Sequence, residues 1–232
     1  MKAILTALLV CACAGRPAPP SVRVWGALHA IMAEGKTEAT VALTDVVPGP
    51  HTYALGALSG LRGEILVLDD RAMASVADGG HVGLDLDARD EKATLLVAAH
   101  VDGWTRVPVT ADIPAADLDA RIEKLAAAAG VDTARPFPFR VEGRLLDLSW
   151  HVLDGSRLPP TATHDERMHA ALRGTAPSAE GSALGFYSTE HVGVFTHMGR
   201  RSHVHAWLPA EGIMGHCDQV GIAAGSVLLF PR

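Results

Sequence analysis

The sequence predicts an α+β protein built on a mixed or antiparallel sheet. Short apolar or alternating runs, such as residues 64–69 and 93–101, are bounded by turn residues and indicate β-strands. Helical spacing of apolar residues occurs in 24–34 and in 112–130, and each stretch meets a glycine at its end. The chain of 232 residues is long enough for one large domain or two small ones with a buried core.

Composition and charge narrow the class of partner. The formal net charge is −6, from 26 acidic against 20 basic residues, and there is no basic run, which argues against nucleic acid. Five Phe, four Trp and two Tyr are too few to provide stacking platforms for bases. Beyond the first twenty residues no apolar stretch approaches the length of a membrane span.

The amino-terminal segment, residues 1–20, is expected to be a targeting signal rather than part of the fold. Lys2 precedes an apolar run over 3–14 that ends in small residues, which is typical of a cleaved secretory signal. The alternative is a lipoprotein signal with the lipid attached to Cys13. Both predict a secreted or periplasmic protein, lipid-anchored in the second case. After cleavage following Ala14 the mature chain would keep only Cys217, expected to be a buried apolar residue rather than a ligand.

Two central stretches carry charged residues that are candidates for chemistry. Residues 52–69 predict two short strands around a glycine turn, with Glu64 opening the second strand. The run FPFRVEGRLLDLSWHV, 137–152, predicts a hairpin whose turn falls just after Arg140. Residues 155–182, rich in Pro, Gly, Ser and Thr, predict a long connecting segment.

The stretch RSHVHAWLPAEGIMGHCDQV has the spacing of a metal site. His203 and His205 would project from one face of a strand, and a turn rich in Pro and Gly would bring back His216 as a third ligand. Three neutral imidazoles leave a zinc ion with an open position, as in catalytic sites. The competing interpretation is a chance pairing among twelve histidines. His191 and His197 are either supports of this set or ordinary loop residues.

Three stretches together resemble the alpha-acetolactate decarboxylase family, bacterial enzymes that convert 2-acetolactate to acetoin. They are LGALSGLRGEILVLDD, FPFRVEGRLLDL and HVHAWLPAEGIMGHCDQV. The first is similar to the family's glycine-rich signature that ends in a strand, and the second to its strand with an arginine before an acidic-Gly pair. The third shares H-x-H, the eleven-residue step to the third histidine and the glycine before it. The three occur in the family's order, and the likeness spans about residues 22–220.

The resemblance implies a set of functional residues. His203, His205 and His216 would bind zinc, Glu64 falls on the family's catalytic glutamate, and Arg140 on its arginine. A zinc Lewis acid would take up charge from the ketone of a small 2-hydroxy-3-oxo acid, and the arginine would hold its carboxylate through two hydrogen bonds. The glutamate would order a water molecule or deliver the proton.

The resemblance also implies a fold: a sheet domain with helices over 21–135, then a β-barrel-like domain over 136–232 that carries the metal site, with the chain forming a homodimer. This chain has Ala57 where the family has Thr. It also stops at Arg232, whereas the family has a longer tail that supplies a second glutamate. The residues that could substitute for that glutamate are Glu211, Glu190 and Glu180.

Two other functions are consistent with the same residues. One is a lactonase-like zinc hydrolase in which Glu64 serves as the base. The other is a non-catalytic extracytoplasmic binding protein that retains the fold and the metal.

Overall fold

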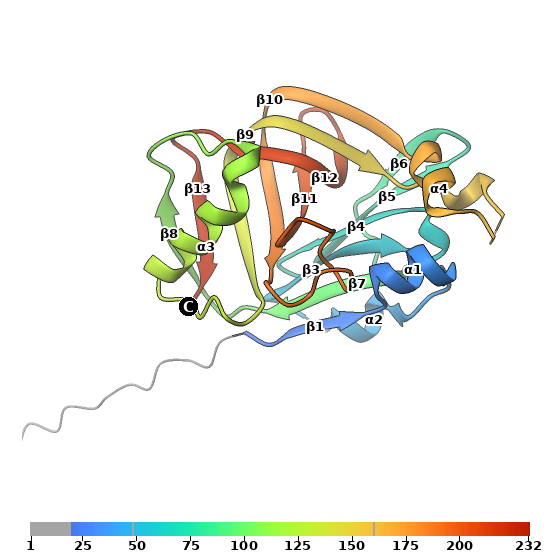
Figure 1. Cartoon of the computed structure of the whole chain (residues 1–232), viewed down its shortest axis with the longest axis horizontal. Helices are drawn as coiled ribbons and strands as arrows, with labels where there is room; N and C mark the ends of the chain where they lie inside the picture. Colours follow the sequence, from blue (N-terminus) through green and yellow to red (C-terminus); the bar gives the residue numbers. More distant parts are fainter. Residues whose placement is uncertain (1–19, 48, 160) are drawn as a thin grey trace, which may run out of the picture.

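The computed structural model describes residues 20–47, 49–159 and 161–232, which form two mostly antiparallel sheets with few helices (Figure 1). The first sheet has the strand order β1-β7-β3-β4-β5-β6, and β2 also pairs with β7. Every pairing in this sheet is antiparallel. Its strands are β1 Val22–Trp25, β2 Val41–Ala42, β3 Thr52–Leu58, β4 Gly63–Leu68, β5 Arg71–Asp78, β6 His81–Asp85 and β7 Lys92–His100.

The second sheet is strongly curled, because its pairing closes on itself. Its order is β10-β11-β12-β9-β13-β8, and β10 also pairs with β9. The strands β9, β10, β11 and β12 therefore pair in a ring, while β13 and β8 extend from β9 to an open end. This agrees only in part with the expected barrel. The strands are β8 Trp104–Pro108, β9 Phe137–Val152, β10 Leu172–Tyr187, β11 Ser202–Leu208, β12 Ile213–Ile222 and β13 Val227–Pro231.

The register of this ring decides which residues meet at the site. Arg140 on β9 lies opposite Leu184 on β10, which lies opposite His205 on β11. His205 lies opposite His216 on β12, and His216 lies opposite His151, again on β9. One circuit of the ring thus returns to β9 eleven residues further along the strand.

The helices are short and cover the outside of the sheets. The α-helices are α1 Leu28–Glu34, α2 Leu43–Val46, α3 Leu118–Ala128 and α4 His164–Ala170, and the 3-10 helices are η1 Ser59–Leu61, η2 Ala115–Asp117 and η3 Gly155–Arg157. Helix α3 packs Leu118, Ile122 and Ala126 into the core of the second sheet. Helices α1 and α4 contact each other, although 130 residues separate them in sequence. None of the helices in the described part of the chain is long and apolar enough to span a membrane.

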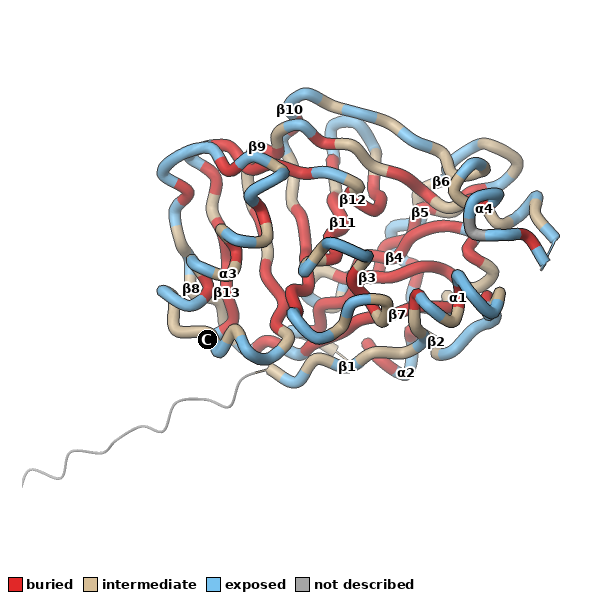
Figure 2. The backbone as a smooth tube through the Cα atoms, in the orientation of Figure 1, coloured by how far each residue is buried: buried red, intermediate tan, exposed pale blue. Residues whose placement is uncertain are grey.

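A shared apolar core holds the two sheets against each other. It combines Tyr53, Leu55 and Leu66 of the first sheet with Leu184 and Phe186 of the second. Figure 2 shows that strands in the middle of the molecule, such as β3, β4 and β11, are largely buried, whereas helix surfaces, outer loops and strand β6 are largely exposed. Burial of this apolar surface is the main term that stabilises the contact between the sheets.

Two expectations for the second half of the chain are wrong. The predicted hairpin after Arg140 does not form, because β9 runs unbroken through Gly143 and is paired on both edges, with β10 and β13. The predicted connecting segment 155–182 contains α4 and most of β10 instead. A glycine in this segment allows a close contact within the sheet rather than a turn, because a Cβ at Gly174 would lie 2.3 Å from the ring of Trp150. Tertiary pairing has overridden local turn preference in both places.

The expectations for residues 1–19, including signal cleavage and lipidation at Cys13, lie outside the described residues. Within the described part, the strand and turn expectations near the histidines are confirmed, since β11 ends at Leu208 and β12 begins at Ile213. Strand β8, which precedes residue 135, pairs with β13 and so belongs to the second sheet.

Candidate metal centre

Three histidines meet where the second sheet faces the first. Alternation along β11 places His203 and His205 on one face, and the β11–β12 register places His216 opposite His205. All three are buried, and their ligand atoms lie within 4.8 Å of one another. Gly215 permits this approach, because a Cβ there would lie 2.8 Å from the carbonyl oxygen of His151 on β9.

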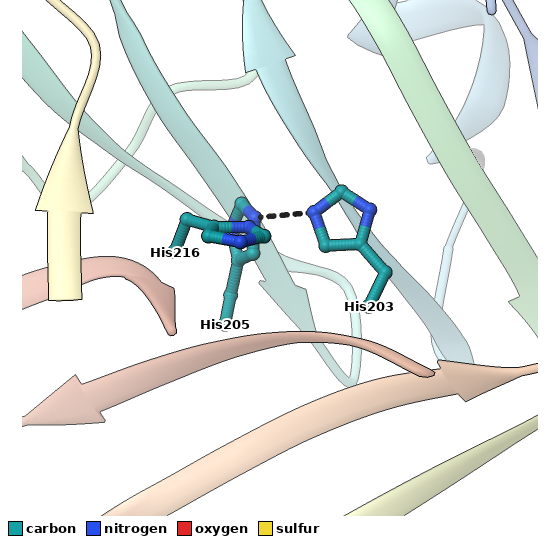
Figure 3. Close-up of side chains that lie close together, drawn as sticks. All are labelled: His203, His205 and His216. Carbon is teal, nitrogen blue, oxygen red and sulfur yellow. Dashed lines mark hydrogen bonds between the residues drawn. The ribbon is translucent and has the colours of Figure 1, made fainter. Parts of the chain in front are cut away.

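The hydrogen bonds of two of these rings fix which nitrogen is available. Nδ1 of His203 donates to the carbonyl oxygen of Phe195 at 2.8 Å, and Nδ1 of His205 donates to that of Ile65 at 2.9 Å. In a neutral ring, a proton on Nδ1 leaves Nε2 with a lone pair. The two Nε2 atoms then face each other at 3.1 Å (Figure 3). Two lone pairs at this distance repel unless a cation lies between them.

Burial keeps these rings neutral. Removal from water lowers the pKa of His205 to about 3, with His151 and His197 contributing to the shift. Burial and the neighbouring histidines also lower the pKa values of His203 and His216 well below the usual range. A proton is therefore a poor candidate for the cation between the two Nε2 atoms.

A zinc ion fits this donor set. Two nitrogens bound tetrahedrally at zinc's usual bond length would lie about 3.3 Å apart, close to the distance between the two Nε2 atoms. The Nδ1 hydrogen bonds to backbone carbonyls are the kind of outer contacts that orient metal-binding imidazoles. His203, His205 and His216 are thus the residues that would hold the ion.

Glu64 lies beside the histidines. Its backbone position depends on Gly63, whose φ of 149° suits glycine and whose absent Cβ would lie 1.8 Å from the carbonyl oxygen of Ser75. The Oε1 atom of Glu64 accepts a hydrogen bond from the backbone N–H of Leu153 at 3.1 Å, and Oε2 lies 3.7 Å from Nε2 of His205. Burial raises the pKa of Glu64 well above its usual value, and the Leu153 hydrogen bond offsets this only in part.

A second group of polar residues adjoins the three histidines. The His151 ring centre lies 4.6 Å from that of His216, and Nδ1 of His151 is hydrogen-bonded to Asp218 Oδ1 at 2.8 Å. Burial acts to raise the pKa of Asp218, but the His151 hydrogen bond and the charge of Arg173 lower it overall. The His197 ring centre lies 5.1 Å from that of His216. Sequence reasoning assigned no role to His151 or Asp218.

Two cavities meet at these polar residues. The first has a volume of about 60 Å³ and is mostly apolar. Its walls include Leu28 and Ile31 of α1, and its polar lining consists of Glu64, His151, Arg167, His197, His203 and His216. The second, of about 230 Å³, shares His151, Met168, His197 and His216 with the first. His151, His197 and His216 therefore line both an apolar cavity and a more polar one.

The structure does not bring Arg140 to either cavity. Its Nη2 donates to Glu142 Oε1 at 3.0 Å, and its guanidinium lies over the rings of Tyr53 and Trp104, at 5.5 and 5.7 Å from their centres. In register, Leu184 stands between Arg140 and His205. Arg140 thus connects β9 with β3 and β8 through these contacts. The β9 residue that lies opposite His216 is His151.

The proposed substitutes for the family's second glutamate also lie elsewhere. Glu190 and Glu211 are exposed, and Glu180 pairs with Arg144 on the surface. None of the three lines either cavity. Asp218 is the carboxylate that is hydrogen-bonded to His151, and it lines the second cavity. Asp218 lies two residues after His216 on β12, and this spacing is the sequence signal from which Asp218 could have been predicted.

Comparison with known proteins supports the fold. A scan against protein-family models finds no match, and a search of curated proteins finds none. Among solved structures, the chain resembles alpha-acetolactate decarboxylase from Bacillus subtilis strain 168 with a TM-score of 0.70 at 12% identity, covering 91% of this chain and 85% of that one. The enzyme from Bacillus subtilis subspecies spizizenii gives 0.70 at 12% identity, covering 91% and 86%.

A third solved structure is a Staphylococcus aureus protein of unknown function described as similar to alpha-acetolactate decarboxylase. It matches with a TM-score of 0.67 at 15% identity, covering 91% of this chain and 84% of that one. These likenesses establish that the chain has the fold of acetolactate decarboxylase structures, and they confirm the resemblance found in the sequence at the level of fold.

Proposed function

We propose that this protein is a zinc-dependent decarboxylase that converts 2-acetolactate to acetoin and CO2. The observation that carries the proposal is the meeting of three neutral histidines with a buried Glu64 beside a cavity that Glu64, His203 and His216 line, in a fold shared with solved acetolactate decarboxylases. When bound, zinc supplies a Lewis acid that accepts electron density from the substrate's ketone as CO2 leaves.

Glu64 is the residue we assign to protonation. Loss of CO2 leaves an electron pair on the former C2, and the product forms when that carbon gains a proton. The Leu153 N–H holds Oε1 in place, and Oε2 lies 3.7 Å from Nε2 of His205, so Oε2 is the atom that would deliver the proton. The apolar wall would disfavour water beside the carbon that is protonated.

His151 is assigned a role in orienting the substrate. Asp218 holds its Nδ1, which leaves Nε2 to hydrogen-bond with an oxygen of a bound substrate. A carboxylate that fixes an imidazole in one orientation is a common arrangement in enzyme sites.

The direct test supplies racemic 2-acetolactate to the purified protein and measures acetoin. We expect acetoin formation above the spontaneous background, loss of activity after chelator treatment and recovery with zinc. The His205→Ala variant, which lacks one proposed ligand, is expected to remain at background. Absence of acetoin from the zinc-loaded protein would contradict the proposal. Tight zinc binding with no turnover would instead favour the non-catalytic binding protein.

The His151–Asp218 pair also supports a second candidate, a lactonase-like zinc hydrolase, because such a pair can accept a proton from an attacking water molecule. A panel of lactones distinguishes the two: ring opening without acetoin formation would select the hydrolase.

A further inference from the structure

Arg167 is a buried cation in the wall of the histidine cavity. It lies on α4, whose first turn is fixed by a capping box between Thr163 and Glu166, and only 5% of the residue is exposed. It lines the same cavity as Glu64 and His203. Its Nε donates to the carbonyl oxygen of Ala162 at 3.2 Å, which holds the base of the guanidinium against the loop before the helix.

The chemistry of this wall favours an anionic ligand. Arg167 is the sole arginine or lysine among the described residues that line the cavity, and much of the rest of the wall is apolar, including Leu28, Ile31 and Leu95. A guanidinium in such surroundings attracts a carboxylate more strongly than in water, because the local dielectric constant is lower. Its planar fork matches the two oxygens of a carboxylate.

The arginine expected to do this from sequence lies outside the cavity. Arg140 pairs with Glu142, lies over two aromatic rings and does not line the cavity. Arg167 reaches the cavity from a different element, α4, which contacts α1, and residues of both helices line the cavity.

We propose that Arg167 binds the carboxylate of the substrate. A residue on α4, rather than one on β9, then positions the carbon–carbon bond that breaks when CO2 leaves. The inference rests on the proposed function, because it assigns the carboxylate end of the same substrate. With the carboxylate at Arg167, the remaining oxygens face the histidines and the alkyl groups face α1. Arg167 then selects for acids against neutral analogues of the same shape.

The test compares a charged ligand with a neutral ligand of the same shape. The acid is 2-hydroxy-2-methylpropanoate, which lacks the ketone needed for decarboxylation, and the neutral ligand is its amide. Binding of each to the zinc-loaded full chain is measured by titration calorimetry for the wild type, Arg167→Gln, Arg167→Lys and, as the matched control, Arg140→Gln. Circular dichroism and zinc content establish that each variant is folded and loaded.

We expect Arg167→Gln to bind the acid about 10- to 100-fold more weakly, the loss expected for a charge-assisted hydrogen-bonded contact, and to bind the amide unchanged. Arg167→Lys should fall between wild type and Arg167→Gln, because it keeps the charge and loses the fork. Arg140→Gln should bind both ligands as the wild type does. If Arg167→Gln does not fold, Arg167→Lys serves as the test: selective loss of acid binding supports the inference, and unchanged acid binding overturns it.

Unchanged acid binding in the folded Arg167 variants would overturn the inference, and so would an equal loss of acid and amide. No binding of the acid by the wild type would also overturn it. The acetoin assay distinguishes failure of this inference from failure of the proposed function. Acetoin formation together with unchanged acid binding in the Arg167 variants would refute only the assignment of Arg167 to the carboxylate. Selective loss of acid binding in a protein that makes no acetoin supports the anion site and refutes the decarboxylation.

Discussion

Zinc should stabilise this fold through the three histidines, and the effect can be estimated. The ligand-bearing strands β11 and β12 also form the contact with the first sheet, so the ion would bind the folded state and not the unfolded chain. Free zinc at one hundred times its dissociation constant would add about 2.7 kcal/mol to the free energy of unfolding. For a chain of this size, that raises the melting temperature by about 5–11 °C.

The assay is thermal unfolding of chelator-treated protein, with and without zinc, for the wild type, His205→Ala and His100→Ala. Only the zinc-induced shift within each variant is compared, so the loss of packing at the fully buried His205 does not enter. His100 is exposed and pairs with Asp102 on the surface, so its removal should leave the shift intact. An equal shift in His205→Ala and the wild type would refute the ligand assignment.

Four further outcomes follow from the structure. Arg140→Met should lower the free energy of unfolding by about 1–2 kcal/mol in urea titrations, through loss of the Glu142 pair and the ring contacts, and change acetoin formation less than twofold. His151→Gln should reduce turnover about 100-fold with zinc content unchanged by atomic absorption. Burial raises the pKa of Glu64, so the folded state binds the carboxyl proton more tightly than the unfolded state does. In metal-free protein, the free energy of unfolding of the wild type relative to Glu64→Gln should therefore fall as the pH rises above 4.5, the ordinary pKa of the group. Urea unfolding at several pH values would measure this difference. Gly215→Ala should cost about 1–3 kcal/mol in the same urea assay, because its Cβ would press on the His151 carbonyl oxygen.

The histidines were predictable because their geometry is local. A separation of two residues along a strand places His203 and His205 on the same face, and the turn after Leu208 brings the chain back so that His216 lies beside them. Glu64 was assigned to the site only through the family resemblance, because strand period shows no more than that Glu64 shares a face with Leu66, which lies in the core between the sheets. Period and turn chemistry therefore predict the histidine set but not the residue that the other sheet brings to it.

The position of His151 was not predictable in the same way, because the alternation of β9 shifts within the strand. Asp147 has a φ of 45°, and the residues that face the core of the second sheet change there from odd positions such as Leu145 to even positions such as Leu148. Arg140 and His151 therefore share the opposite face, although they are an odd number of residues apart. A regular strand would have separated them.

Arg167 was missed for a different reason. A stretch rich in Pro, Gly, Ser and Thr predicts a loop, and a charged residue in a loop is normally exposed. Here the stretch folds into α4 under its own capping box and turns Arg167 inward. Burial of a charge at such a place depends on the cavity that receives it, and the cavity is assembled from α1, β3 and β11 as well.

The site and the packing of the two sheets are a single feature of this fold. Nδ1 of His205 is held by the carbonyl oxygen of Ile65, and the Ser75 hydroxyl is hydrogen-bonded to the carbonyl oxygen of Met214, so strands of the first sheet orient ligand strands of the second. Glu64 reaches back across the same boundary to the backbone of Leu153. Separation of the sheets would therefore release the imidazoles and the carboxyl together. The metal affinity and the contact between the sheets should consequently weaken in parallel, even in variants that leave every proposed ligand in place.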